Sequence, residues 1–212
     1  MITDVAWDFD GTLCDSYPFI LNNFRTALSE VGIHDDELWI QKRVEVSVTS
    51  AASQYAAEHG VPEAEILSHF HRYDQVPDFQ MVKPEPGVLS TLALVKELGG
   101  RNHLYTHRHH EVFAYLSEFG MDRLLDSMIT SDDGFPPKPA PDALLSLRKR
   151  YAIPEGLLLM IGDRPIDIDA GWNAGCATCL FNSHHFPAVE HATYTVDSYQ
   201  ELKPILRTIL SR

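Results

Sequence analysis

Long apolar runs are missing from this sequence. No stretch approaches the roughly 18 consecutive apolar residues that a membrane span needs, although 44% of the residues are hydrophobic. The first residues place no basic region ahead of an apolar one, so we expect no secretory signal. These absences predict a cytoplasmic protein that does not enter a membrane.

Basic residues are scarce. The chain has 17 Lys and Arg against 30 Asp and Glu, which gives a formal charge of -13. A surface this negative repels nucleic acid and anionic lipid, and no cluster of basic residues offers a local exception. We therefore expect no nucleic-acid or membrane partner. An anionic substrate would have to be bound by a dication, by backbone amides and by a few basic side chains.

Cysteine is also rare. Three cysteines, an odd number, argue against a disulfide framework. Cys176 and Cys179 form a CxxC pair, but residues 177–181 have the pattern of a strand, in which residues three apart point to opposite faces. A redox CxxC usually opens a helix instead. We expect buried structural thiols at both positions rather than a redox pair.

Short apolar segments alternate with helical patterns over most of the 212 residues. The expected strands are 2–9, 102–106, 127–130, 157–161, 177–181 and 193–196. The expected helices between them are 87–98, 112–119 and 143–151. This alternation predicts an α/β fold in which helices cover both faces of a parallel sheet. In such sheets, ligands bind at the carboxyl ends of the strands.

One region, residues 14–83, breaks the alternation. It shows helical periodicity and no convincing strand, with helices expected near 19–31, 37–44, 50–59 and 62–73. Pro84, Pro86 and Gly87 mark the return to the alternating pattern. We therefore expect a core domain made of residues 1–13 and 84–212, and a separate helical lobe made of residues 14–83.

Two carboxylates, Asp8 and Asp10, stand at the end of the first apolar segment, where residues 8–13 read DFDGTL. Unpaired, they would repel each other, and a dication held between them removes that cost. Asp8 could then bind the metal and still attack phosphorus, while Asp10 passes a proton to a leaving group. The backbone amides of Gly11 and Thr12 are expected to bind phosphate.

Polar residues also end later segments. Thr106 closes one strand, and its hydroxyl can bind a phosphoryl oxygen. Lys138 lies among prolines, which position it at low entropic cost to neutralise a phosphoryl group. Asp163 ends the strand at 157–161 and is expected to complete the metal site. Asp167 is expected to hold Lys138 or a metal-bound water in place.

Each of these positions has a plainer interpretation when taken alone. Asp-Gly after a strand is common in turns, and Lys138 by itself would be an ordinary surface lysine. Asp167 could serve as the acidic residue that the dipole favours at a helix N-terminus, a role compatible with one in the site. The combination of the segments, in this order, favours a catalytic site.

Four histidines, His103, His107, His109 and His110, are close together in the sequence and suggest a zinc site. Acidic partners and the usual ligand spacing are missing, so a solvated loop at the start of a helix is the favoured interpretation. In that loop His107 and Arg108 would border the phosphate.

The four polar segments resemble, in this order, the motifs of the haloacid dehalogenase superfamily. The resemblance runs from Asp8 to about Gly175, with residues 14–83 where subfamily I places its helical cap. It implies a Rossmann-like sheet and an aspartyl-phosphate formed on Asp8, with Asp10 as general acid and base. It also implies a Mg²⁺ ion held by Asp8, the backbone carbonyl of Asp10, and Asp163.

Asp10 separates branches of that family, because dehalogenases and phosphonatases lack a carboxylate there. The chain looks most similar to phosphoglycolate-phosphatase-like members, although Arg164 replaces the small residue often found after the motif aspartate. We expect a phosphatase, monomeric or homodimeric, acting on a small phosphorylated metabolite such as phosphoglycolate or a sugar phosphate. The alternatives are a phosphomutase of the β-phosphoglucomutase type and a non-catalytic regulator that binds a phospho-ligand.

Overall fold

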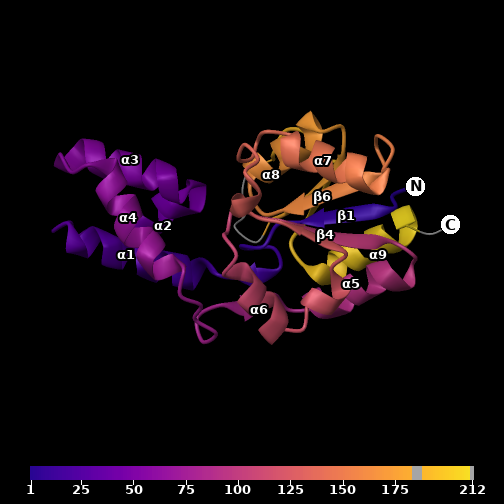
Figure 1. The fold of residues 1–212 in the computed structure, drawn as a ribbon, viewed down its shortest axis with the longest axis horizontal. Coiled ribbons are helices and arrows are strands. Elements are labelled where there is room, and N and C mark those ends of the chain that lie inside the picture. The colour runs from indigo at the N-terminus through magenta and orange to yellow at the C-terminus, as the bar shows by residue number, and fades with distance from the viewer. Residues whose placement is uncertain (183–187, 211–212) are drawn as a thin grey trace. The chain divides into compact units, whose positions relative to one another are not determined.

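The computed structural model describes residues 1–182 and 188–210, and it divides the chain into two compact units. The first unit consists of Met1–Asp15 and Pro84–Arg212, and the second of Ser16–Lys83 (Figure 1). The second unit is therefore an insertion into the first. It begins a few residues after the first strand.

The first unit is built on a parallel sheet that has six strands within the described residues, in the order β5-β4-β1-β6-β7-β8. Their bounds are β1 Asp4–Trp7, β4 Arg101–Tyr105, β5 Ser127–Ile129, β6 Leu158–Gly162, β7 Ala177–Phe181 and β8 Tyr194–Val196. All four residues of β1 are buried, as expected of a central strand covered on both faces. The predicted α/β fold with a parallel sheet is confirmed.

Helices lie on both faces of this sheet. They are α5 Val88–Glu97, α6 Val112–Glu118, α7 Asp142–Tyr151, α8 Pro165–Asn173 and α9 Tyr199–Leu210. Figure 1 shows α7 and α8 on one face, and α5 and α9 on the other. The contact of α8 is especially close, because a Cβ atom added at Gly171 would lie 2.8 Å from side-chain atoms of Met160 in β6 and Thr178 in β7.

The second unit is helical and has a core of its own. Its helices are α1 Tyr17–Glu30, α2 Glu37–Val46, α3 Val48–His59 and α4 Glu63–Asp74. The ring of Phe24 lies 6.1 Å from those of Tyr55 and Phe70, so three helices meet around one aromatic cluster. Ser47 caps α3 by accepting a hydrogen bond from the Ser50 amide, and Gly60 ends the helix in a left-handed conformation. The predicted inserted helices are confirmed.

The expectation that residues 14–83 contain no strand was wrong at both ends of the segment. Cys14–Asp15 forms β2 and Lys83–Pro84 forms β3, and the two pair in a separate small sheet. A two-residue strand is too short to show the alternation of polar and apolar residues by which strands are recognised in a sequence.

All three cysteines are buried as free thiols in the described chain. Burial raises the pKa of both Cys176 and Cys179 to about 12, so both thiols stay protonated at neutral pH. The prediction of buried structural thiols is confirmed.

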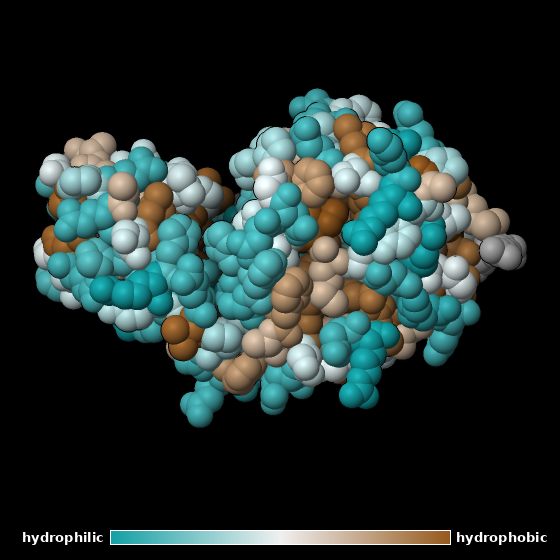
Figure 2. Space-filling view, in the orientation of Figure 1, coloured by the Kyte–Doolittle hydropathy of each residue, from teal (hydrophilic) through white to brown (hydrophobic). Residues whose placement is uncertain are grey.

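Hydrophilic side chains cover most of the surface visible in Figure 2, and the hydrophobic ones form small groups. No helix in the described parts of the chain combines the length and hydropathy that a membrane span requires.

Candidate active site

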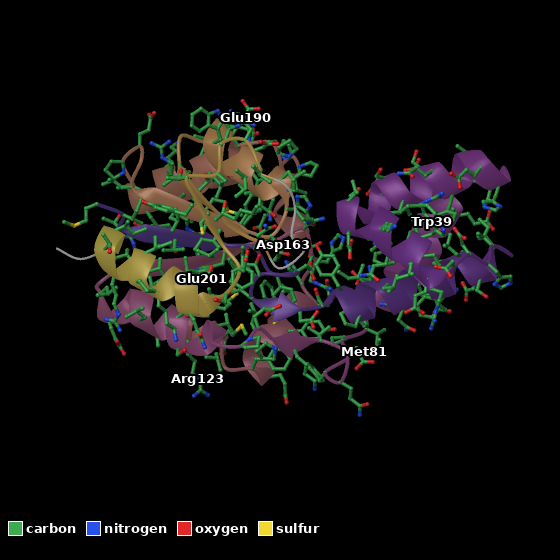
Figure 3. All side chains as sticks on the ribbon, turned by 180° about the vertical axis from the view of Figure 1, so that it is seen from behind. Trp39, Met81, Arg123, Asp163, Glu190 and Glu201 are labelled. Atoms are coloured by element: carbon green, nitrogen blue, oxygen red, sulfur yellow. The ribbon has the colours of Figure 1, made fainter. Side chains whose placement is uncertain are left out.

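Three neighbouring strands end at the same edge of the sheet, and each is followed by a polar residue. Asp8 follows β1, and its amide donates to the Ile161 carbonyl of β6. Thr106 follows β4, and its amide donates to the Ile129 carbonyl of β5. Asp163 directly follows β6, and Figure 3 labels it at this edge. The carboxyl ends of the strands thus carry the residues predicted for the site.

The turn after β1 uses its own backbone groups. The Gly11 amide donates to the Cys14 carbonyl at 2.8 Å, with Gly11 at a φ of 66° that favours glycine. The Thr12 amide lies 3.4 Å from the Phe9 carbonyl. Gly11 and Thr12 were predicted to give their amides to a phosphate, but the Gly11 amide is already used, because a buried turn must satisfy its own donors.

Lys138 connects the nucleophile candidate to a second acid. Its ammonium Nζ lies 2.6 Å from Asp8 Oδ1 and 2.7 Å from Asp167 Oδ1, and all three side chains are buried. It also lies over the ring of Tyr105, 4.6 Å from the centroid. Burial alone would lower the pKa of Lys138, but Asp167 and Asp8 together raise it above its usual range. Lys138 is therefore a fixed positive charge.

The cost of burying the Asp8 carboxylate is offset less completely. Burial raises the pKa of its carboxyl to about 7, and Lys138 offsets only part of that rise. Its second oxygen, Oδ2, is buried without a hydrogen-bond partner among the residues that the structure describes. Such an atom costs free energy unless a cation or an electrophile approaches it.

Carboxylate oxygens of Asp8, Asp163 and Asp167 lie within 4.8 Å of one another, close enough to hold a metal ion. The two oxygens of Asp167 already have other partners: Oδ1 accepts from Lys138, and Oδ2 accepts from the Arg164 amide at 3.1 Å. Asp8 and Asp163 are therefore the better placed for a cation. Asp167 instead orients Lys138.

Gly162 makes that arrangement of Asp167 sterically feasible. A Cβ atom at position 162 would lie 2.3 Å from the Cβ of Asp167 and 2.6 Å from its Oδ2. Only glycine leaves room for the Asp167 side chain against the end of β6. Arg164 precedes α8, and its Nε lies 3.8 Å from Asp163 Oδ1.

Thr106 and His107 follow β4, and their side chains form different hydrogen bonds. The Thr106 hydroxyl accepts a hydrogen bond from the Arg108 amide at 3.1 Å, so its own proton is available for a phosphoryl oxygen. His107 Nε2 accepts from the Lys138 amide at 2.8 Å. Burial and the neighbouring Lys138 lower the pKa of His107 to about 4. His107 is therefore a neutral support for the Lys138 loop.

Asp10 forms an ion pair that the sequence did not indicate. Both Nε and Nη2 of Arg108 lie 2.8 Å from Asp10 Oδ1. The Arg108 side chain is only 3% exposed. The prediction placed Arg108 beside the phosphate. In the structure it contacts the second carboxylate of the first motif.

The remaining histidines of the cluster have different surroundings. His103 is buried in β4 and lies 2.8 Å from both Asp4 Oδ1 and Ser127 Oγ, so the solvated loop does not include it. His109 and His110 are exposed and contact Asp132 on the surface.

A sequence model of the family described as haloacid dehalogenase-like hydrolase matches residues 5–181 of the chain. Among curated proteins, the phosphoglycolate phosphatase of Pseudomonas savastanoi is 29% identical, over 94% of this chain and 78% of its own length. That of Haemophilus influenzae is 28% identical, over 95% of this chain and 97% of its own length.

Solved structures of hydrolases are also similar to this chain over most of its length. A hydrolase from Streptococcus pneumoniae is 30% identical, with a TM-score of 0.60 over 97% of this chain and 98% of that one. A haloacid dehalogenase-like hydrolase from Bacteroides fragilis, described as putative, is 21% identical and has a TM-score of 0.83 over 95% of this chain and 100% of that one. The second likeness concerns the fold alone.

Proposed function

The chain belongs to the haloacid dehalogenase-like hydrolases and is a phosphatase of that family, and we propose that it hydrolyses a small phosphate monoester through an aspartyl-phosphate on Asp8. One observation carries this proposal. Asp8 lies at the active edge of the sheet with one oxygen bound to Lys138 and the other buried without a partner. A carboxylate in this state favours reaction with an electrophilic phosphorus.

In the first half-reaction a carboxylate oxygen of Asp8 attacks phosphorus, and the bond from phosphorus to the ester oxygen breaks. The departing oxygen takes the bond electrons and receives a proton from Asp10. The leaving group therefore departs as a free alcohol. Lys138 stabilises the charge on the phosphoryl oxygens, and the Thr106 hydroxyl donates to one of them. The products are the alcohol and a phosphorylated Asp8.

In the second half-reaction water attacks the phosphorus of the aspartyl-phosphate and gives one proton to Asp10. The bond from phosphorus to Asp8 breaks, which releases inorganic phosphate and restores both carboxyl groups to their starting states. Asp10 therefore serves once as acid and once as base. This double task requires its carboxyl group to stay in one place between the two steps.

The acidic residues at this edge fit a magnesium ion. Mg²⁺ prefers oxygen ligands, and Asp8 and Asp163 present buried carboxylate oxygens within 4.8 Å of one another. We propose that Asp8 and Asp163 hold the ion together with the Asp10 backbone carbonyl. When bound, it would neutralise part of the charge on the phosphoryl group.

The substrate class rests on the relatives. Those from Pseudomonas savastanoi and Haemophilus influenzae are named phosphoglycolate phosphatases. At 28–29% identity we propose only the wider class of small phosphorylated metabolites, in which phosphoglycolate and sugar phosphates are the first candidates.

The test is Asp8→Asn, assayed on p-nitrophenyl phosphate with Mg²⁺, with the exposed Asp142→Asn as matched control. We expect Asp8→Asn to lower kcat by at least about 10³-fold and Asp142→Asn to leave it unchanged. Acid quenching of the native enzyme should trap one phosphoryl group on the peptide that contains Asp8. Normal turnover by Asp8→Asn would refute the proposal.

A panel of phosphate esters decides between the proposal and its rivals. Conversion of hexose 1-phosphates to an isomer without release of phosphate would indicate a phosphomutase. Binding of phosphate esters without turnover of any of them would indicate a regulator.

A further inference from the structure

We propose that Arg108 is a positioning residue. It holds the carboxyl group of Asp10 where this group can give a proton to the leaving oxygen in the first half-reaction and take one from water in the second. The inference rests on the proposed function, because it assigns Asp10 the proton transfers described above. It adds a residue that is outside the four sequence motifs.

The contact between the two side chains is close and specific. The Nε and Nη2 atoms of Arg108 both lie 2.8 Å from Asp10 Oδ1. The exposed fractions are 3% for the Arg108 side chain and 15% for that of Asp10, so water screens this ion pair weakly. The Nε–H group donates a hydrogen bond to Asp10 Oδ1, and Nη2 adds a close ion-pair contact to the same oxygen, which restrains the position of the carboxyl group.

Arg108 is itself held on several sides. Its guanidinium lies over the rings of Phe9 and Tyr115, at 5.4 and 5.8 Å from their centroids. The Glu111 carboxylate lies 3.8 Å from Nη1. At the backbone, the Arg108 amide donates to Thr106 Oγ1 and its carbonyl accepts from the Ser131 amide. A guanidinium so restrained is a rigid anchor.

The backbone contact links the two sides of the reaction. Thr106 is the residue proposed to bind a phosphoryl oxygen, and Arg108 follows it by two residues. The phosphoryl group and the leaving group are thus positioned by one short segment after β4. Arg108 keeps its proton throughout, because a guanidinium does not titrate in proteins. It acts on the reaction only through Asp10.

This role predicts a dependence on the leaving group. An alkyl alcohol needs a proton from Asp10 to depart, whereas p-nitrophenolate departs without one. Misplacing Asp10 should therefore slow the first half-reaction for alkyl phosphates and spare it for p-nitrophenyl phosphate. The second half-reaction, in which Asp10 takes a proton from water, should slow for both substrates.

The experiment compares Arg108→Met with the native enzyme by rapid mixing in the presence of Mg²⁺. With p-nitrophenyl phosphate, we expect a burst of about one p-nitrophenolate per active site, followed by a steady state about 10²-fold slower than native. With phosphoglycolate or glycerol phosphate, we expect no burst and a similar fall in kcat. KM should change little, because the role proposed for Arg108 involves no contact with the substrate.

A double-mutant cycle asks whether the effect passes through Asp10. In an Asp10→Asn background, Arg108→Met should cause less than a threefold further loss, since non-additivity is the signature of residues that act as a unit. Arg148→Gln is the matched control. It removes a partly buried arginine that binds the Ala174 carbonyl, and it should lower stability without changing the leaving-group dependence.

The results that would contradict the positioning role differ from the result that would contradict the proposed function. If Arg108→Met folds and slows both substrates equally without a burst, or adds fully to Asp10→Asn, the positioning role is wrong. If Arg108→Met does not fold, Arg108→Lys supplies the same comparison. Lysine keeps the positive charge but lacks the planar guanidinium group, so a smaller burst should appear. If Arg108→Lys shows no burst, the positioning role is contradicted. An inactive native enzyme would instead refute the proposed function.

Discussion

The ammonium group of Lys138 lies 2.6 Å from Asp8 Oδ1, with both side chains buried at the end of β1. One lysine here serves two buried carboxylates, because Asp167 Oδ1 is at 2.7 Å on its other side. The charge of Lys138 therefore supports both the fold and the proposed chemistry, and the two contributions can be separated by mutation.

Lys138→Met should reduce both activity and stability. It leaves Asp8 and Asp167 buried without their cation, which we expect to lower the free energy of unfolding by about 3 kcal/mol. It should also lower kcat by at least about 10²-fold. Urea titration measures the first quantity, and phosphate release with saturating p-nitrophenyl phosphate measures the second.

Adding Asp167→Asn to Lys138→Met should return part of the lost stability, because one of the stranded carboxylates is gone, and should restore no activity. If the double variant were less stable than Lys138→Met, the buried ion pair could not be the cause of the loss.

Stability without metal should depend on pH through Asp8. Burial raises the pKa of this carboxyl in the folded protein to about 7, whereas an unfolded aspartate has its ordinary pKa near 3.9. The folded state therefore binds the extra proton between these values, and stability contributed by Asp8 is lost as the pH rises from about 4 to about 7. Urea titrations in EDTA should show this decline, and Asp8→Asn should remove it.

Mg²⁺ should restore stability at pH 7.5 in the native protein, because an ion bound beside the ionised Asp8 binds the folded state alone. The same ion should stabilise Asp8→Asn much less. Equal stabilisation of the two proteins by Mg²⁺ would show that the ion binds elsewhere.

The site was predictable from the sequence wherever a strand end fixed a residue's place. Asp8, Thr106 and Asp163 each follow a buried strand, and parallel strands bring their carboxyl ends to one edge whatever the rest of the chain does. Arg108 was not recognised in this way. Its pairing with Asp10 depends on the path of the loop after β4, which periodicity does not describe.

Some details of local backbone conformation could not be predicted from the sequence either. The DG pair indicated a turn, but not that the Gly11 amide would be used by the Cys14 carbonyl. The elements expected from the sequence end at residue 196 and include no helix over 199–210, a stretch that contains Pro204. In the structure α9 includes Pro204, and its buried residues pack against the sheet and α5. Tertiary packing thus outweighed local propensity there.

Gly162→Ala should impair catalysis by displacing Asp167. The new Cβ would lie 2.3 Å from the Asp167 Cβ, so this side chain, and Lys138 with it, must shift. A displacement near 1 Å can cost about 10²-fold in rate. We expect kcat on p-nitrophenyl phosphate to fall by about that factor.

Gly171→Ala is the matched control for Gly162→Ala. Its Cβ would meet Met160 and Thr178 at 2.8 Å, away from Lys138. It should lower the free energy of unfolding by about 1–3 kcal/mol through overpacking and keep the kcat of the folded fraction. A loss of kcat in Gly171→Ala as large as in Gly162→Ala would contradict the assignment of the effect to Asp167.

Asp4 should govern stability in acid, at the opposite end of the sheet. This buried carboxylate accepts hydrogen bonds from Arg101, His103 and Thr3. Burial alone would raise its pKa, but the bonds from His103 and Arg101 outweigh burial and lower the pKa to about 2. A lowered pKa means that stability is present above about pH 4 and is lost as the pH falls toward 2.

The size of that loss follows from the difference of nearly two pKa units, about 2 kcal/mol. Asp4→Asn should therefore lower the free energy of unfolding at pH 7 and flatten its fall between about pH 4 and pH 2. The exposed Asp142→Asn should leave the same part of the curve unchanged. Urea titrations at closely spaced pH values measure both variants. An unaltered acid limb in Asp4→Asn would mean that other carboxylates drive the acid unfolding.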